Sequence, residues 1–111
     1  LSTADILVVG AAYKPDVSDT RESPAIDIID RLEEWHADVA YHDPHVPTLE
    51  VGERTYESVP MTTDRLTDSD CVVLVTDHSV LDIREIVEHA PLVFDTRNAT
   101  SGIDAEHVVR L

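Results

Sequence analysis

Basic residues are scarce in this sequence. Lys14 is the only lysine, and the 8 lysines and arginines face 23 aspartates and glutamates, which gives a formal net charge of −15. Nucleic acids and anionic membranes bind proteins through basic surfaces, so the composition argues against both as partners. Because screening in concentrated salt shortens the reach of charge repulsion to a few ångströms, the acidic excess predicts a halophilic protein.

Cysteine is almost absent. The single cysteine, Cys71, cannot form an internal disulfide, which favours a reducing, cytoplasmic compartment. Cys71 begins the aliphatic run 71–75 and has no neighbouring base in the sequence, so we expect a buried structural thiol and not a nucleophile.

Long apolar runs are also missing, and no stretch approaches the ~20 residues of a membrane-spanning helix. No signal-peptide pattern opens the chain. Its 111 residues with 42 % hydrophobic content predict one globular domain over residues 1–111. Because the chain starts at Leu1 and its one methionine is Met61, we expect a piece of a longer protein.

Short apolar runs alternate with segments of helical periodicity. This alternation predicts an α/β fold, a Rossmann-like three-layer α/β/α sandwich with a mostly parallel sheet. The expected strands are 6–9, 39–42, 54–56, 71–76, 92–94 and an edge strand at 108–109, and the expected helices are 24–35, 64–67 and 80–89.

The first helix has clear sequence signals at its start. Ser23 suits the N-cap and Pro24 the first helical position. Apolar residues then recur at helical spacing through Trp35, which predicts that Trp35 belongs to the core.

The loop between the first strand and this helix holds Lys14 and Arg21. Two cations beside a helix N-terminus suit a phosphate, although pairing with the loop acids Asp16, Asp19 and Glu22 is an open alternative. In a parallel sheet the carboxyl ends of all strands share one edge, and Arg97 follows a later strand. The convergence of Lys14 and Arg97 favours an anion site; the same edge collects Tyr13, Arg21, Asp43 and His78.

Other motifs point elsewhere but are weaker. Asp43 ends the second strand, like the ribose-binding acid of dinucleotide folds, yet the first loop lacks G-x-G-x-x-G. His42 and His45 could form a metal pair, but no third ligand is evident, so unrelated loop histidines are expected. A phosphoacceptor receiver domain needs acids at the end of the first strand, where Val8-Val9-Gly10 stands.

Several blocks of the sequence resemble the C-terminal domain of the UDP-glucose/GDP-mannose dehydrogenase family. The similarity covers nearly the whole chain, and its first two blocks together are highly specific. The blocks are Gly10-Ala11-Ala12-Tyr13-Lys14-Pro15-Asp16-Val17, Asp19-Thr20-Arg21-Glu22-Ser23-Pro24-Ala25, Tyr41-His42-Asp43-Pro44, Thr76-Asp77-His78 and Asp95-Thr96-Arg97-Asn98.

The resemblance implies an NAD-dependent enzyme that oxidises the C6 hydroxyl of a UDP-sugar to a carboxylate. It implies that Tyr13 and Lys14 contact the UDP-sugar, that Arg97 holds the diphosphate and that Arg21 reaches NAD bound to another domain. The motifs are more similar to the UDP-N-acetylmannosamine (or N-acetylglucosamine) dehydrogenase branch than to the UDP-glucose branch. His36 stands where a glycine commonly ends the first helix of the family.

The same resemblance implies that much of the enzyme lies elsewhere. The family's catalytic cysteine and NAD-phosphate loop belong to N-terminal and central domains, which this chain lacks, and Cys71 does not match that cysteine. We therefore expect no catalytic residue and no turnover in this chain alone, and a homodimer or larger assembly for the full-length enzyme. The alternative is a non-catalytic α/β nucleotide-binding or protein-interaction module.

Overall fold

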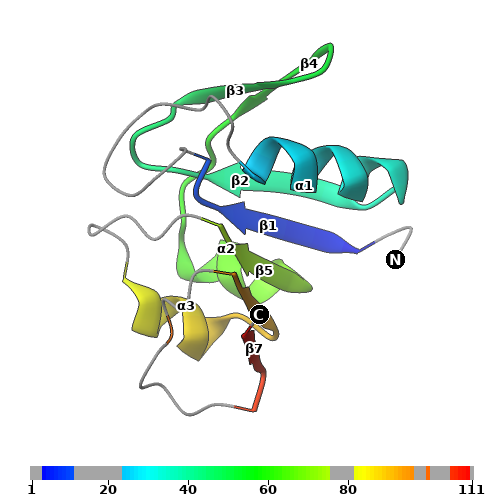
Figure 1. Ribbon diagram of the computed structural model, residues 1–111. Coiled ribbons are helices and arrows are strands. Elements are labelled where there is room, and N and C mark those ends of the chain that lie inside the picture. The colour runs from blue at the N-terminus through cyan, green and yellow to red at the C-terminus, as the bar shows by residue number, and fades with distance from the viewer. Residues whose placement is uncertain (1–3, 12–23, 76–81, 97–99, 101–105, 111) are drawn as a thin grey trace.

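A parallel sheet forms the centre of the molecule (Figure 1). The computed structural model describes residues 4–11, 24–75, 82–96, 100 and 106–110. Within these residues five strands pair in parallel in the order β2-β1-β5-β6-β7. They are β1 (Asp5–Val9), β2 (Asp38–His42), β5 (Cys71–Leu74), β6 (Val93–Asp95) and β7 (Val108–Arg110). The predicted parallel α/β fold and the edge position of the last strand are confirmed.

Helices cover both faces of this sheet (Figure 1). α1 (Pro24–Glu34) lies on one face, and α2 (Thr63–Asp68) and α3 (Ile83–His89) lie on the other. Beyond α1 lies an antiparallel hairpin of β3 (Thr48–Val51) and β4 (Arg54–Glu57). β3 was not predicted, because its four residues alternate between exposed and buried side chains over too short a span.

The core is divided by the sheet into two apolar clusters. On the α1 face, Val8 and Tyr41 pack with Ile29 and with Leu49 of the hairpin. On the other face, the buried cluster comprises Leu7, Val9, Leu66, Val72, Leu74, Ile86, Ala90 and Val93. Consecutive residues of β1 therefore contribute to opposite clusters, which explains the continuous apolar run of this strand.

Side-chain caps fix the starts of the two short helices. Thr62 accepts a hydrogen bond from Arg65 N at 3.1 Å and so caps the N-terminus of α2, close to the predicted start of this helix. Asp82 accepts one from Glu85 N at 3.1 Å and has an extended backbone. The predicted start of the later helix at residue 80 is therefore wrong, since the cap at Asp82 makes Ile83 the first helical residue.

The end of α1 corrects the expectation for Trp35. The chain closes the helix in a Schellman motif, with hydrogen bonds from Ala37 N to Leu32 O (3.1 Å) and from His36 N to Glu33 O (3.0 Å). His36 has φ 64°, the conformation a glycine usually supplies there. This reversal turns the buried Ala37 inward instead, and Trp35 is left 58 % exposed.

Candidate functional site

The carboxyl edge of the sheet is where the sequence places the binding residues. Of that set, Asp43 lies among the described residues. The predicted Tyr13, Lys14, Arg21, His78 and Arg97 lie outside the described residues, as does the predicted cap Ser23. The structure does describe Ala11, Thr96 and Thr100, which lie in sequence beside the segments that carry these side chains.

The chain leaves β1 through two residues that are tied to β2. Gly10 has φ 95°, in the region that favours glycine, and its N–H donates to His42 O at 2.8 Å. The next N–H, of Ala11, donates to Oδ2 of Asp43 at 2.6 Å. The start of the segment that carries Lys14 is thus held by hydrogen bonds to the end of the neighbouring strand.

Asp43 itself is buried, with 2 % of its surface exposed. Its Oδ2 accepts from Ala11 N and its Oδ1 accepts from His45 N at 2.7 Å. Both carboxylate oxygens therefore bind main-chain N–H groups. The carboxylate therefore supports the main chain at Ala11, just after β1, and at His45.

Asp95 holds an equivalent position at the end of β6 and is fully buried. Its Oδ2 accepts from Thr100 N at 2.8 Å and from Thr100 Oγ1 at 2.6 Å. Thr96, the residue after Asp95, donates through its N–H (3.2 Å) and its Oγ1 (2.6 Å) to Leu74 O of β5. The residues on both sides of segment 97–99 are therefore bonded to strand ends.

Sequence reasoning missed Asp95 and Thr100 as a pair. The signal available was an acid that ends an apolar strand five residues before a threonine. Such a spacing is common and has no meaning until the strand end and the following turn are known.

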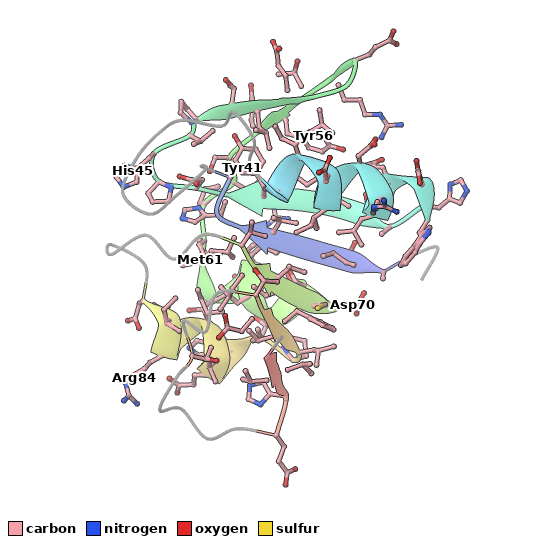
Figure 2. All side chains as sticks on the ribbon, viewed as in Figure 1. Tyr41, His45, Tyr56, Met61, Asp70 and Arg84 are labelled. Atoms are coloured by element: carbon pink, nitrogen blue, oxygen red, sulfur yellow. The ribbon has the colours of Figure 1, made fainter. Side chains whose placement is uncertain are left out.

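Tyr41, near the carboxyl end of β2 (Figure 2), is fully buried on the α1 face of the sheet. Its hydroxyl donates to Val46 O at 2.9 Å, which fixes the chain that follows β2. Burial, with the nearby charges of Asp43 and Glu57, raises the pKa of Tyr41 to about 12. The phenol therefore stays neutral at ordinary pH and acts as a hydrogen-bond donor.

The histidines of this region make structural contacts. The Nδ1 atom of His42 lies 2.7 Å from Val59 O, next to the hydrogen bond from Val59 N to Tyr41 O (2.9 Å). Within residues 4–11, 24–75, 82–96, 100 and 106–110, no group of three or more His, Cys, Asp or Glu side chains is arranged to hold a metal ion.

Cys71 lies at the opposite, amino-terminal edge of the sheet, directly after Asp70 (Figure 2). Its side chain is half-buried, and burial together with the charge of Asp70 raises the pKa of the thiol. A thiol that stays protonated is a poor nucleophile, which agrees with the structural role predicted for it. The full burial that was expected is not observed.

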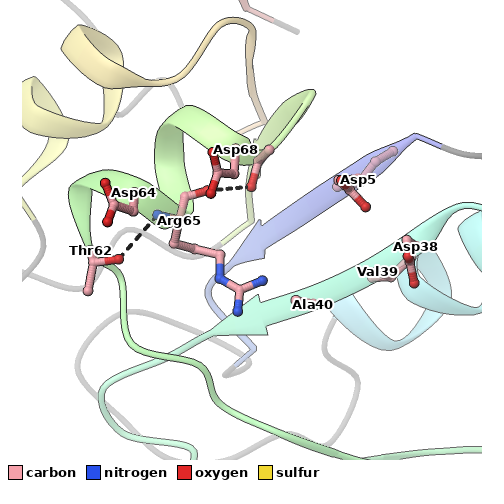
Figure 3. Close-up of a pocket in the computed structure, with 10 residues that line it drawn as sticks. Asp5, Asp38, Val39, Ala40, Thr62, Asp64, Arg65 and Asp68 are labelled. Atoms are coloured by element: carbon pink, nitrogen blue, oxygen red, sulfur yellow. Dashed lines mark hydrogen bonds between the residues drawn. The ribbon is translucent and has the colours of Figure 1, made fainter.

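A groove of about 460 Å³ opens between α2 and the first halves of β1 and β2 (Figure 3). Four aspartates, Asp5, Asp38, Asp64 and Asp68, line it together with the guanidinium of Arg65. Four carboxylates around one cation repel a diphosphate. This groove is therefore a poor candidate for a nucleotide site, and it lies away from the carboxyl edge.

Comparison with known proteins decides the family. Residues 7–102 match the UDP-binding domain of the UDP-glucose/GDP-mannose dehydrogenase family. The chain belongs to this family. The matched span includes both anchored segments, from β1 through Asp43 to Asp95 and Thr100.

Relatives in this family cover most of the chain. A UDP-N-acetyl-D-mannosamine dehydrogenase of Methanococcus vannielii is 37 % identical in an alignment of 101 residues that covers 84 % of this chain and 22 % of the relative. The UDP-glucose 6-dehydrogenase TuaD of Bacillus subtilis is 33 % identical in an alignment of 104 residues that covers 86 % of this chain and 22 % of that protein. The chain thus spans about a fifth of the length of these relatives.

Solved structures agree on the fold. A UDP-N-acetyl-mannosamine dehydrogenase of Staphylococcus aureus superposes with a TM-score of 0.68 and 29 % identity, over 96 % of this chain and 25 % of that one. A UDP-D-ManNAc dehydrogenase of Pyrococcus horikoshii superposes with a TM-score of 0.71 at 24 % identity, over 98 % of this chain and 25 % of that one.

In the part of the chain that the structure describes, no helix has both the length and the apolar character needed to cross a membrane.

Proposed function

We propose that this domain is the C-terminal, UDP-binding part of an NAD-dependent nucleotide-sugar dehydrogenase, which oxidises the C6 hydroxyl of a UDP-sugar to a carboxylate. The observation that carries the proposal is that the segments with Lys14 and Arg97 start from anchored residues at one edge of the sheet. β5 alone separates β1 from β6, so the two segments leave the sheet about 10 Å apart, two strand spacings. A lysine and an arginine can both reach one ligand across that distance.

The residue types suit the parts of the ligand. Lys14 supplies a point charge for a phosphate, and Tyr13 beside it supplies a ring and a hydroxyl for the nucleotide-sugar. Arg97 offers a planar fork of donors, which matches the paired oxygens of a diphosphate. Against a chain of net charge −15, these cations provide a local positive site for a dianionic ligand.

We propose UDP-N-acetylmannosamine as the sugar nucleotide. Support comes from the Methanococcus relatives of that name, which are 34–39 % identical, against 33 % for TuaD. Comparing kcat/KM of the full-length protein for UDP-N-acetylmannosamine and UDP-glucose, by NADH absorbance, tests this choice. A preference for UDP-glucose would contradict it.

NAD fits a neighbouring domain better than this one. The chain has three glycines, Gly10, Gly52 and Gly102, whose spacing cannot form G-x-G-x-x-G, and Asp43 is buried against main-chain N–H groups. We assign only Arg21 a contact to NAD, which when bound supplies the hydride acceptor. The remaining domains, a catalytic cysteine and a cytoplasmic homodimer or larger assembly are part of the same proposal.

Titration calorimetry with UDP, at high salt, tests the nucleotide site, with UMP as the matched control that lacks one phosphate. We expect UDP to bind more tightly than UMP, because the β-phosphate meets the charges of Lys14 and Arg97. The titration is run on this chain and on the full-length protein. No binding of millimolar UDP to either, with a stoichiometric protein partner recovered instead, would favour a non-catalytic interaction module.

We further propose that the protein works in concentrated salt. Several of its carboxylates gather at places such as the groove of Figure 3, which Asp5, Asp38, Asp64 and Asp68 line. Screening of this repulsion in molar KCl should raise the melting temperature by several degrees, at about 4 °C for each kcal/mol gained. In the double variant Asp38→Asn/Asp68→Asn, the melting temperature should rise less over the same increase in KCl concentration. An unchanged melting temperature between low and molar KCl would contradict the proposal.

A further inference from the structure

Two buried carboxylates occupy matching places at the carboxyl edge. Asp43 directly follows β2 and Asp95 ends β6, and 2 % or less of each residue is exposed. A buried carboxylate is costly unless hydrogen bonds compensate for the lost water. Both compensate in part by accepting from residues at the border of a predicted binding segment, Ala11 and Thr100.

The contact of Asp95 joins the two residues that flank segment 96–99, which contains Arg97. Residues 96–99 lie between Asp95 and Thr100, and Thr100 returns to Asp95 through both its N–H and its hydroxyl. Thr96, at the other end, is held by Leu74 O. Thr96 and Thr100, on either side of the segment that carries Arg97, are therefore both hydrogen-bonded to strand ends.

The contact of Asp43 acts on the start of the other segment. Ala11 lies three residues before Lys14, and its N–H donates to Oδ2 of Asp43. The second oxygen of Asp43 holds His45 N, and Ser58 Oγ accepts from Asp43 N at 2.9 Å. Asp43 is thus held both through its carboxylate and through its main-chain N–H, which makes it a rigid support for the chain that leaves β1.

We propose that Asp43 and Asp95 are positioning residues for nucleotide binding, acting through Lys14 and Arg97 respectively. Hydrogen bonds from N–H groups to a carboxylate are stronger than bonds to a neutral acceptor, so they hold the segment borders before the ligand arrives. Preordering of this kind raises affinity because less freedom is lost on binding. The inference rests on the proposed nucleotide site and extends it to two residues to which we assign no direct contact with the nucleotide.

Thr100 gives the sharpest test on the Arg97 side. Thr100→Val keeps the shape of the side chain but removes the hydroxyl bond to Asp95, and we expect UDP binding to weaken about 3-fold to 10-fold. Thr100→Ser, which keeps the hydroxyl, should restore most of the affinity. Thr67→Val is the matched control, since Thr67 Oγ1 donates to Thr63 O at 2.6 Å within α2, far from this edge.

A double-mutant cycle separates positioning from a general loss of stability. If Thr100 acts through Arg97, then in an Arg97→Ala background Thr100→Val should change UDP affinity less than 2-fold, while urea unfolding shows the same loss of stability in both backgrounds. Equal weakening of UDP binding in both backgrounds would overturn the inference. Wild-type affinity in Thr100→Val would overturn it too.

The Lys14 side is tested in the same way with Asp43→Asn. Asparagine has one oxygen and one NH₂ group in place of the two carboxylate oxygens, so its NH₂ group must face one of the two N–H groups that donate to Asp43. Because two donors then face each other, we expect UDP binding to weaken about 10-fold. Asp38→Asn, at the exposed amino end of β2, should leave UDP affinity unchanged. Loss of affinity in Lys14→Ala without loss in Asp43→Asn would overturn the inference and leave the proposed function intact. A wild-type protein that binds no UDP would overturn both.

Discussion

Leu7→Ala should lower the free energy of unfolding by about 2–5 kcal/mol, the cost of a large cavity in a packed core. Leu7 is fully buried in β1, where it packs with Leu66 of α2, Leu74 of β5 and Ile86 of α3. Its neighbours belong to three different elements, which cannot all move in to fill the space. Domains of this size have about 5–15 kcal/mol in total, so this loss is a substantial part of the stability.

Urea unfolding of the wild type and the variant measures this effect. The midpoint should fall while the slope stays constant, because the surface exposed on unfolding hardly changes. Trp35→Ala is the control: although tryptophan is much larger than leucine, Trp35 is 58 % exposed, and its truncation should cost less than about 1 kcal/mol. A larger loss for Trp35→Ala than for Leu7→Ala would contradict the packing described here.

The contrast between these two residues shows what periodicity can and cannot predict. The run Ile6–Val9 identified β1 because a strand covered on both faces must be apolar at every position. The same kind of reasoning failed at Trp35, which continues the apolar spacing of α1 but occupies its C-cap. Whether the last residue of a stripe is buried depends on how the chain turns, and here His36 adopts the turn that glycine usually makes.

The candidate site divides in a similar way. Lys14 and Arg97 could be proposed from sequence because cations are rare in this chain and both follow predicted parallel strands. Asp43 was noticed for its place at a strand end, but the sequence did not show that its carboxylate accepts hydrogen bonds from Ala11 N and His45 N. Which group a buried acid bonds depends on which strand ends lie side by side in the fold. Those strand ends are far apart in the sequence, so no local pattern can predict the pairing.

Lys14→Ala and Arg97→Ala should each weaken UDP binding by about 1–3 kcal/mol, or roughly 5-fold to 150-fold. Each substitution removes a charged hydrogen-bond donor from the proposed diphosphate site, in a chain that has only 8 lysines and arginines to attract an anion. Titration calorimetry with UDP measures the loss. Binding of UMP should suffer less than binding of UDP, since UMP lacks the β-phosphate.

Arg21→Ala is the matched control, because it removes a cation from the same segment as Lys14 without, on our assignment, touching UDP. We expect its UDP affinity to equal that of the wild type, and its NAD use to fall only in the full-length enzyme.

If Arg21→Ala weakens UDP binding as much as Lys14→Ala does, the cations of this loop attract UDP by their combined charge, and the assignment of separate roles is wrong. If Lys14→Ala and Arg97→Ala both keep wild-type affinity, UDP binds elsewhere. The anchors at Ala11 and Thr100 would then serve the stability of the sheet edge alone, since no ligand contact would depend on the segments they hold.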